Sequence, residues 1–588
     1  MENWVLQAKR ADFKRLGEKF GIDQVTARII RNRGNVTDEE FDRYLNGSPK
    51  DLYDPHLLSG ADQAADIIAS KIRDKKRIMV IGDYDIDGVC ASYILVTALK
   101  RAGADVICEI PERMTDGYGL NIRLVEDAVR LGADTIITCD NGIAARDSIA
   151  YAKAEGLTVI VTDHHEPPFH MEGTEKVMDL PEADICIDPK LPWDTYPFKN
   201  ICGAVVAWKL MIVLCEKMGL PETYWMDLIE EAAFATVGDV MDLTDENRII
   251  VKYGLKALRD TSNPGMRALI RACGLEGQEL AAWHVGFLLG PCINASGRLE
   301  TAERSLKLLL EPDGRKAEVI AEELTELNEE RKSMTAKAVE EGIALIEDSC
   351  MKDDKVLVVY LPDCHESIAG IVAGKIRERF ARPTLVLTNA AEEGMAKGSG
   401  RSVEVYNMFE GLNACAGLME KFGGHPMAAG LTLKIENIER LRSALNRNCT
   451  LSEKDLIPTL MIDVPMPVDY ITENLIEELS ILEPCGKANE KPLFAQKDLL
   501  VTSMKILGKN GNVLKCSVVS PGGRTVEAIY FGNIDELLRH LEEKYSKEAV
   551  SAALAGGRSN MRMSIVYYPG INEFRGNRTI QITIKSYH

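Results

Sequence analysis

From Arg77 onward the chain alternates short apolar runs with longer amphipathic stretches. The runs have the length of buried strands and are Ile78–Ile81, Asp105–Ile110, Thr135–Cys139 and Thr158–Thr162. Helical periodicity fills the intervals between them, as in Leu120–Leu131 and Ala144–Glu155. Strands that alternate with helices at this spacing predict an α/β domain with a doubly wound parallel sheet. Ligands of such sheets bind beyond the carboxyl ends of the strands.

Polar side chains follow the apolar runs where this rule expects a ligand. They are Asp83, Asp85 and Asp87 after the first run, Asp140 after the third, Asp163, His164 and His165 after the fourth, and Asp239 after a later apolar run that begins at Phe234. Singly, Asp140 can be a helix cap, the His pair a polar loop and Asp239 the start of a turn. Together, clusters at the ends of successive strands are more than capping explains, and they predict one convergent site. Carboxylates with neutral His suit Mn²⁺, and the carboxylates also accept Mg²⁺.

The pattern Asp-x-Asp-x-Asp-Gly at residues 83–88 also opens the loop of calcium-binding helix-loop-helix proteins. That loop needs a bidentate Glu at its twelfth position, which here is Ile94. It also needs oxygen donors where Val89 and Ala91 stand. The calcium-loop interpretation therefore fails, and a metal-dependent hydrolase site and a structural acidic turn remain open.

Length and charge bound the organisation more than the function. At about 150 residues per domain, 588 residues predict three or four domains. The net charge of −20 argues at first sight against a nucleic-acid partner, but a local basic groove can coexist with it. Charge alone therefore excludes neither class.

Cysteine usage and hydropathy point to a chain that works in the cytoplasm. The fourteen cysteines show no Cys-x-x-Cys spacing, so neither a zinc knuckle nor a disulfide framework is predicted. Most, such as Cys139 and Cys202, lie in apolar runs and are expected to be buried thiols of a reducing compartment. No amino-terminal signal is visible in Met1–Arg15, and the most apolar window, Ile201–Cys215, is too short to span a bilayer. We expect a soluble chain without a membrane partner.

The ordered motifs Asp83–Gly88, Asp140, Asp163–His165 and Gly238–Asp239 resemble those of the DHH phosphoesterase family, which is named for the Asp-His-His triplet. The resemblance implies hydrolysis of a phosphate ester by two metal ions, Mn²⁺ or Mg²⁺. The metal ligands that it implies are Asp85, Asp87, Asp140, His164 and Asp239, with Asp83 as a further ligand or a close neighbour. It places His165 against the scissile phosphate and makes His165, Asp163 and Arg298 the catalytic candidates.

Further motifs are similar to the branch of this family that contains single-strand-specific 5′→3′ DNA exonucleases. They are the segments 111–120, 291–298, 398–402 and 422–430, and with the metal motifs the resemblance covers roughly residues 50 to 500 in matching order. Glycines let backbone amides approach phosphate oxygens, and an Arg among them adds a bidentate fork. The substrate-binding residues that the resemblance implies are Arg113, Asn294, Arg298, Ser399, Arg401, Gly423, Gly424 and His425.

Within that set, the resemblance gives Arg113, Ser399 and Arg401 to a pocket for the terminal 5′ phosphate. It gives Arg298 to the backbone near the cut and places His425 close to the active site. A turn with a satisfied His is the plainer interpretation of 423–425. Cys292 departs from the branch, which often has Arg there, and one DNA contact is expected to change.

The predicted organisation has five parts. Residues 1–75 form a helical segment to which we assign no chemistry, 76–300 the DHH phosphoesterase domain, 301–349 a long connecting helix, 350–450 a second, smaller α/β DHH-associated domain that binds nucleic acid, and 451–588 a β-barrel that binds single strands. The last part carries short alternating runs separated by Gly-containing turns, which is typical of a small antiparallel barrel, and the resemblance implies an OB-fold.

The function that the resemblance implies is a metal-dependent, single-stranded-DNA-specific 5′→3′ exonuclease that releases 5′-mononucleotides in DNA repair and recombination. Its expected partners are single-stranded DNA, a single-strand-binding protein and a helicase, and we expect a monomer. A phosphodiesterase for short oligonucleotides or cyclic dinucleotides is the first alternative, but such proteins generally lack a carboxyl-terminal barrel. A nucleic-acid-binding factor that has lost its metals is the second, and the intact carboxylates argue against it.

Overall fold

The computed structural model describes residues 2–113, 116–173, 175–508, 510–557, 559–574 and 576–588. Met114 and Thr115, within the segment 111–120, lie outside the described residues. The chain divides into two compact units, one made of Ser48–Leu456 and the other of the residues up to Gly47 together with Ile457–His588. The helical segment predicted for residues 1–75 is thus divided between the two units.

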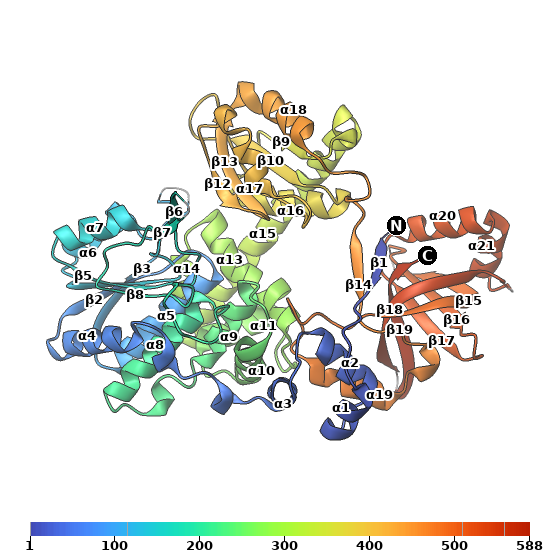
Figure 1. Ribbon diagram of the computed structural model, residues 1–588, viewed down its shortest axis with the longest axis horizontal. Helices are drawn as coiled ribbons and strands as arrows, with labels where there is room; N and C mark the ends of the chain where they lie inside the picture. The colour runs from blue at the N-terminus through green and yellow to red at the C-terminus, as the bar shows by residue number, and fades with distance from the viewer. Residues whose placement is uncertain (1, 114–115, 174, 509, 558, 575) are drawn as a thin grey trace. The chain divides into compact units, whose positions relative to one another are not determined.

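A five-stranded, wholly parallel sheet lies at the centre of the first domain in the larger unit (Figure 1). Its strands run in the order β3 (Asp105–Glu109), β2 (Arg77–Ile81), β4 (Thr135–Cys139), β5 (Thr158–Thr162) and β8 (Ile185–Ile187). The four predicted strands are confirmed. Strand β8 was not predicted, because a strand of three residues carries too little periodicity to be recognised.

Helices cover both faces of this sheet, because successive residues of a strand point to opposite sides. On one face Ile78 and Val80 pack with α4 (Ala61–Arg73), α5 (Ile86–Arg101) and α8 (Gly203–Lys217). On the other, Met79 and Ile81 pack with α6 (Ile122–Arg130) and α7 (Arg146–Ala154). The predicted doubly wound arrangement is confirmed.

The strand order fixes where a ligand can bind. From β2 the chain proceeds to β3 on one side and then returns to β4 on the other, so β2 and β4 are neighbours whose following loops diverge. The crevice at such a switch point is the usual ligand site of an open α/β sheet. Here it lies between the loops that begin at Gly82 and Asp140.

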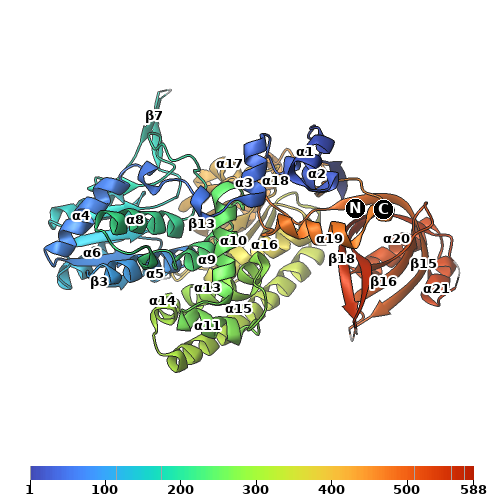
Figure 2. The same ribbon diagram turned by 90° about the horizontal axis from the view of Figure 1, so that it is seen from below.

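One element differs from the prediction. Asp239 does not follow a strand, because the apolar run before it forms the end of helix α9 (Ile229–Gly238). A short apolar run has the same composition in a buried helix as in a buried strand, so periodicity could not distinguish them. The β6–β7 hairpin (Phe169–Glu172 and Glu175–Met178), which projects from this domain in Figure 2, was also not predicted.

The 34-residue helix α15 (Gly314–Glu347) connects the parallel sheet to a second, mixed sheet, as predicted. That sheet has the order β12 (Lys421–His425), β13 (Ala428–Lys434), β11 (Met395–Arg401), β10 (Thr384–Asn389) and β9 (Leu357–Tyr360). Helix α16 (Ala369–Phe380) and the end of α15 pack on one face, and α17 (Met408–Asn413) and α18 (Ile438–Asn448) on the other. Gly423–His425 belong to strand β12, so they do not form a turn.

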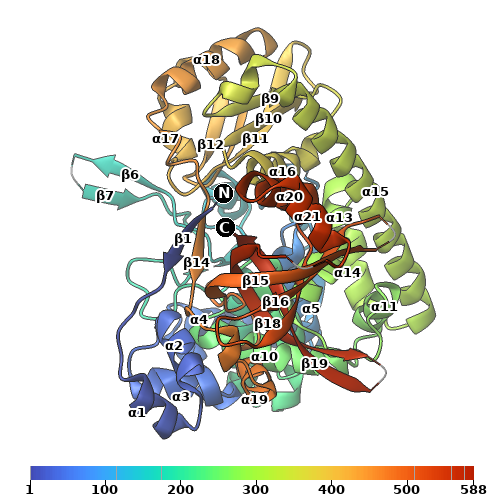
Figure 3. The same cartoon turned by 90° about the vertical axis from the view of Figure 1, so that its right-hand side faces the viewer.

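The smaller unit contains a closed barrel, drawn in orange and red in Figure 3. Its strands are β15 (Phe494–Leu507), β16 (Val513–Val519), β17 (Thr525–Tyr530), β19 (Asn577–Tyr587) and β18 (Arg562–Phe574). Helices α20 (Ile534–Lys544) and α21 (Lys547–Leu554) lie between β17 and β18 in the chain. The predicted barrel is confirmed, but it is not wholly antiparallel, because β17 and β19 pair in parallel.

The amino-terminal residues complete this unit. Helices α1 (Phe13–Phe20), α2 (Gln24–Asn32) and α3 (Asp38–Asn46) add side chains to the same hydrophobic core as the barrel. Strand β1 (Asn3–Leu6) pairs in parallel with β14 (Thr459–Ile462). Strand β1 was not predicted, because its partner lies at the other end of the chain.

Two further observations concern cysteines and hydropathy. All fourteen cysteines are free thiols. No helix among the described residues combines the length and the apolar sequence that a membrane span needs.

Candidate metal centre and phosphate pocket

The turn after β2 carries three carboxylates and is held by its own side chains. Asp85 caps helix α5, and its Oδ1 accepts hydrogen bonds from the N–H groups of Asp87 at 3.0 Å and Gly88 at 3.1 Å. A Cβ atom at Gly88 would lie 2.5 Å from the backbone nitrogen of Asp83, so the helix can approach the strand this closely only with glycine there. The turn therefore presents its carboxylates from a fixed backbone.

A second helix fixes the third of these carboxylates. The N–H groups of Gly203 and Ala204, at the start of α8, donate to Asp87 Oδ2 at 2.7 Å and Oδ1 at 2.8 Å. The amino terminus of a helix stabilises negative charge, and these two N–H groups fix the position of the Asp87 carboxylate. This contact was not predicted, because it joins residues far apart in the chain and carries no local signal.

The loop after β4 positions Asp140 with a strained backbone. Asp140 has φ of +60°, a conformation that is uncommon outside glycine and that occurs frequently at functional sites. Its carbonyl accepts a hydrogen bond from the hydroxyl of Tyr118 at 2.7 Å, and Asn141 Nδ2 donates to the carbonyls of Ile81 at 3.1 Å and Cys139 at 2.9 Å. Helix α7 begins only at Arg146, so Asp140 does not cap it.

The Asp-His-His triplet follows β5. Asp163 Oδ1 lies 2.7 Å from His165 Nδ1 and also accepts the N–H of His164 at 2.8 Å, while its Oδ2 accepts the N–H of Ile143 at 2.9 Å. Both oxygens of Asp163 are thus occupied in orienting the loop and His165. Burial would lower the pKa of His165, but the hydrogen bond to Asp163 and the surrounding carboxylates raise it to about 9.

The side chains that were assigned to the metals from the sequence meet at one place. His164 Nε2 lies 3.1 Å from Asp140 Oδ1, 3.5 Å from Asp87 Oδ2 and 3.8 Å from Asp239 Oδ2. Asp83, Asp85 and Asp140 form an adjoining group whose ligand atoms lie within 4.8 Å of one another. Asp140 belongs to this group and also to a group with His164 and His165, so its carboxylate would contribute to cation binding in both groups.

The electrostatics of this cluster favour a cation. Burial, reinforced by the neighbouring carboxylates, raises the pKa of Asp83, Asp85 and Asp140 above the ordinary aspartate range. Both carboxylate oxygens of Asp83, Oδ1 of Asp140 and Nδ1 of His164 are buried and have no hydrogen-bond partner among the described residues. Buried donors and acceptors are normally satisfied, so the orphaned oxygens fit a divalent metal.

Three arginines lie beside the cluster. The Arg113 guanidinium stands 4.8 Å from the ring centroid of Tyr84, which is itself in the carboxylate turn. Arg298 donates from Nη1 to the carbonyl of Ser367 at 2.8 Å, and Arg401 donates from Nη1 to Ser399 Oγ at 3.0 Å. None of the three forms an ion pair with a carboxylate within the described ranges.

Burial and mutual repulsion mark these arginines as a site for an anion. Burial is the main cause that lowers the pKa of Arg298 to about 10, and repulsion by the charge of Arg113 is the second. Burial also lowers the pKa of Arg401, with Arg377 and Arg113 adding to the effect. Cations that are buried together without counter-ions are stabilised by a bound anion such as phosphate.

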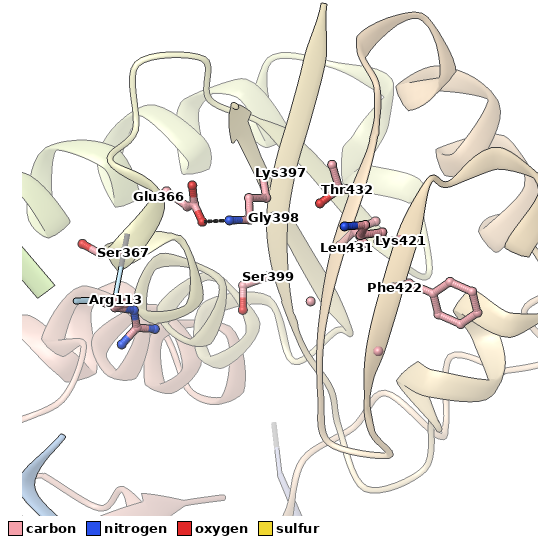
Figure 4. Close-up of a pocket in the computed structure, with 12 residues that line it drawn as sticks. Arg113, Glu366, Ser367, Lys397, Gly398, Ser399, Lys421, Phe422, Leu431 and Thr432 are labelled. Atoms are coloured by element: carbon pink, nitrogen blue, oxygen red, sulfur yellow. Dashed lines mark ion pairs between the residues drawn. The ribbon is translucent and has the colours of Figure 1, made fainter. Parts of the chain in front are cut away.

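A pocket of about 390 Å³ is lined by Arg113 and by Ser367 and Ser399, which are the hydrogen-bond partners of Arg298 and Arg401 (Figure 4). Gly423 also lines it, as do Lys397 of β11 and Lys421 of β12, the strands on either side of β13. Lys397 is paired with Glu366 at 2.5 Å. The two lysines were not among the predicted site residues, because isolated lysines give no pattern until β11, β13 and β12 bring them to one pocket.

The remaining substrate-binding candidates are placed less uniformly. Asn294 Oδ1 accepts a hydrogen bond from the N–H of Ile86 at 2.8 Å, so this side chain supports the carboxylate turn. Gly424 and His425 are exposed in β12 but do not line the pocket described above. Cys292 is only 2% exposed and is packed against Cys273.

The parallel sheet, the acidic and imidazole cluster at its switch point, and the attached mixed sheet define a phosphoesterase of the DHH class. Family models described as the DHH family N-terminal domain, the DHHA1 domain and the RecJ OB domain match residues 77–236, 353–450 and 462–586. The chain belongs to the RecJ family of single-stranded-DNA-specific exonucleases.

The family assignment rests on near full-length similarity. The chain is 36% identical over 585 residues to the single-stranded-DNA-specific exonuclease RecJ of Bacillus subtilis (strain 168), covering 99% of this chain and 70% of the relative. It is 32% identical over 605 residues to the same-named protein of Dickeya dadantii (strain 3937), covering 99% of both. The crystal structure of RecJ in complex with Mn²⁺ from Thermus thermophilus matches with a TM-score of 0.80 and 25% identity, covering 100% of this chain and 79% of that one.

Proposed function

We propose that this chain is a metal-dependent exonuclease that degrades single-stranded DNA from the 5′ end and releases 5′-mononucleotides. The observation that carries the proposal is the contact between Arg113 and Tyr84. In this contact an uncompensated guanidinium of the phosphate pocket lies directly against the turn that bears Asp83 and Asp85. A phosphate held by the arginines is therefore next to a cluster fitted for divalent cations.

The metal ligands in this proposal are Asp83, Asp85, Asp87, Asp140, His164 and Asp239, which hold a pair of Mn²⁺ or Mg²⁺ ions. When bound, the ions make the attacking water more acidic and neutralise negative charge on the phosphoryl oxygens. Support comes from the orphaned oxygens of Asp83 and Asp140 and from the family's structures determined with Mn²⁺ and Mg²⁺.

His165 and Asp163 act together beside the metals. Because Asp163 Oδ1 holds His165 Nδ1 at 2.7 Å, the imidazole ring has a fixed orientation. The ring can then donate a hydrogen bond to an oxygen of the scissile phosphate. Asp163 is a positioning residue, since its two oxygens are already occupied by the loop and by His165.

The phosphate pocket selects the 5′-phosphorylated end of the strand. Arg113, Ser399 and Arg401 bind the terminal 5′ phosphate. Arg298 contacts the DNA backbone near the cut. The backbone amides of Gly423 and Gly424, in β12, approach phosphate oxygens of the strand. His425 and Asn294 complete the substrate-binding set. Asn294 acts mainly indirectly, because it supports the carboxylate turn through Ile86. Because the terminal phosphate is anchored, the next phosphodiester bond is the one presented to the metals, and a mononucleotide leaves.

The barrel accounts for the preference for single strands. A small closed barrel of the OB type binds unpaired strands through stacking and backbone contacts, largely without regard to sequence. The match of residues 462–586 to the RecJ OB domain favours this function over hydrolysis of dinucleotides, which needs no such domain. We place the enzyme in DNA repair and recombination.

The proposal includes the setting in which the enzyme works. Single strands arise by unwinding and are then coated, so a helicase and a single-strand-binding protein are its expected partners. Fourteen free thiols suit a reducing cytoplasm. We further propose a monomer, which size-exclusion chromatography with light scattering would check.

The test compares four substrates that carry a tritium label in the base of the first nucleotide, in the presence of Mn²⁺. They are a long single strand with a 5′ phosphate, the same strand with a 5′ hydroxyl, its duplex and a dinucleotide. We expect labelled mononucleotide from the phosphorylated single strand as the first product, and none after chelation. Internal cuts, or faster hydrolysis of the dinucleotide, would overturn the proposal.

A further inference from the structure

Two cysteine thiols face each other away from the metal centre. Cys273 directly follows helix α11 (Pro264–Ala272), and Cys292 lies in the first turn of helix α13 (Gly290–Leu299). Their sulfur atoms are 3.9 Å apart. Cys292 is 2% exposed, whereas Cys273 is partly exposed. One thiol can therefore be reached from solvent while the other stands directly behind it.

An open pocket leads to this pair. The pocket has a volume of about 530 Å³ and is lined by both cysteines and by residues of α15, among them Asn328 and Lys332. It is large enough for a small solute such as a peroxide to reach Cys273. Among the described residues, the two sulfurs are not held in any metal-ligand group of His, Cys, Asp or Glu.

The surroundings distinguish the two sulfurs. The Cys292 thiol can donate to the carbonyl of Leu288 at 3.2 Å or turn to the sulfur of Cys273, and Asn328 Nδ2 donates to it at 3.5 Å. The hydrogen bond from Cys292 lowers the pKa of Cys273 despite partial burial, and Lys332 adds to this effect. Cys273 is thus the more readily ionised thiol, and Cys292 is placed to react second.

We propose that Cys273 and Cys292 form an oxidisable pair that closes to a disulfide when the protein meets hydrogen peroxide. The Cys273 thiolate attacks a peroxide oxygen, the O–O bond breaks, and Cys273 becomes a sulfenic acid. The departing hydroxide takes up the proton that Cys273 released and becomes water. Cys292 sulfur then attacks Cys273 sulfur, the S–O bond breaks, and the leaving hydroxide takes the Cys292 proton as a second water. The two thiols are oxidised and the peroxide is reduced.

Closing the disulfide affects the carboxylate turn after β2 through helix α13. The sulfurs must approach to about 2 Å, which draws the first turn of α13 toward the end of α11 and breaks the contact of Cys292 with Leu288. Two residues further along α13, Asn294 holds Ile86 of the carboxylate turn. A Cβ atom at Gly297 would lie 2.2 Å from the carbonyl oxygen of Tyr84, so α13 packs on that turn without slack. The oxidised protein therefore cleaves DNA more slowly.

The loss of cleavage rests on the proposed nuclease function, but the oxidation chemistry does not. The two cysteines fall in one tryptic peptide, residues 272–298, which contains no other cysteine and no internal Lys or Arg. The full-length chain is treated with hydrogen peroxide, the peroxide is removed with catalase, and free thiols are alkylated before digestion. Cys350, which is exposed, reports general oxidation in the same sample.

We expect this peptide to lose two hydrogen atoms in mass and to resist alkylation before Cys350 is modified, with both effects reversed by dithiothreitol. Cleavage by the parent chain should fall several-fold and recover on reduction, while Cys273→Ser and Cys273→Ala keep their activity after peroxide. Alkylation of both cysteines at a peroxide dose that oxidises Cys350 would overturn the pair. A closed disulfide with unchanged cleavage would overturn the coupling to the turn. A parent chain with no nuclease activity would contradict the proposed function. The mass of the peptide would still show whether Cys273 and Cys292 form a disulfide.

Discussion

Asn294 Oδ1 accepts a hydrogen bond of 2.8 Å from the backbone N–H of Ile86, and this bond ties helix α13 to the turn that carries Asp85 and Asp87. Ile86 is the first residue of helix α5, and the N–H groups in the first turn of a helix have no partner within the helix. The carboxylate turn is thus held from three directions, by its own Asp85, by the start of α8 and by Asn294. A side chain far away in the sequence belongs to the support of the metal centre.

Replacing Asn294 with Ala should therefore weaken metal binding. The buried N–H of Ile86 would lose its partner, at a cost of about 1–3 kcal/mol. We expect the Mn²⁺ concentration for half-maximal cleavage to rise by about tenfold, which corresponds to about 1.4 kcal/mol. Asn294→Asp retains the acceptor oxygen and is the matched control. An unchanged metal dependence in Asn294→Ala would show that the turn does not need this bond.

Asp140→Ala should abolish cleavage but leave strand binding, because the carboxylate serves the ions and not the grip on the backbone. The expected loss is at least about 10³-fold in rate, or about 4 kcal/mol of the activation barrier. Strand binding is followed separately by fluorescence anisotropy with a labelled single strand in the presence of a chelator. The exposed Asp147, in the first turn of the neighbouring helix α7, provides Asp147→Ala as the control. Equal cleavage by Asp140→Ala and the parent chain would refute the role.

Arg401→Ala should weaken cleavage of 5′-phosphorylated strands and leave strands with a 5′ hydroxyl nearly unaffected. Removing one charge-assisted contact to phosphate costs about 1.5–3 kcal/mol, so the preference for phosphorylated ends should fall by roughly tenfold or more. The measurement is kcat/KM on the two ends, with Arg440→Ala on the surface of α18 as the control. An equal loss on both ends would count against a terminal-phosphate pocket.

The parts of this molecule that could be predicted are those with strong local periodicity. Strands β2 to β5 of the parallel sheet, the long helix α15 and the barrel strands all carry patterns that repeat within a few residues. The polar residues after β2, β4 and β5 were also predictable, because the rule for parallel sheets says where such residues must meet.

What could not be predicted depends on contacts between distant segments. Strand β1 exists only because β14 pairs with it, and Asp87 is held by amides of Gly203 and Ala204. The strand expected before Asp239 is the end of a buried helix, since both present an unbroken apolar run. Lys397 and Lys421 become one feature only when their strands lie in one sheet.

A pH effect on stability is expected at His56, which lies in the short helix Pro55–Leu57 and is not one of the proposed metal ligands. Its ring nitrogens lie 3.0 Å from Glu216 and 3.1 Å from Asp62, and the hydrogen bond to Glu216 raises its pKa above 6.5. Because the folded-state pKa is raised, the stabilisation is fully present below the unfolded-state pKa and is lost as the pH rises through the folded-state value.

His56→Gln tests this effect. It keeps a hydrogen-bonding side chain but has no charge to lose. The Tm of the parent chain should exceed that of His56→Gln by more at about pH 5.5 than at about pH 9. A difference that is constant across this range would mean that the ion pairs of His56 contribute nothing.

Equilibrium dialysis of the full-length chain against Mn²⁺ addresses the metal centre itself, without relying on any substrate. The parent chain should bind two ions, and Asp140→Ala, which removes the carboxylate common to both groups, should lose measurable affinity at both positions while Asp147→Ala binds as the parent does. If the parent chain binds no Mn²⁺, or if Asp140→Ala binds as many ions as tightly, the cluster of Asp83, Asp85, Asp87, Asp140, His164 and Asp239 is not a metal centre.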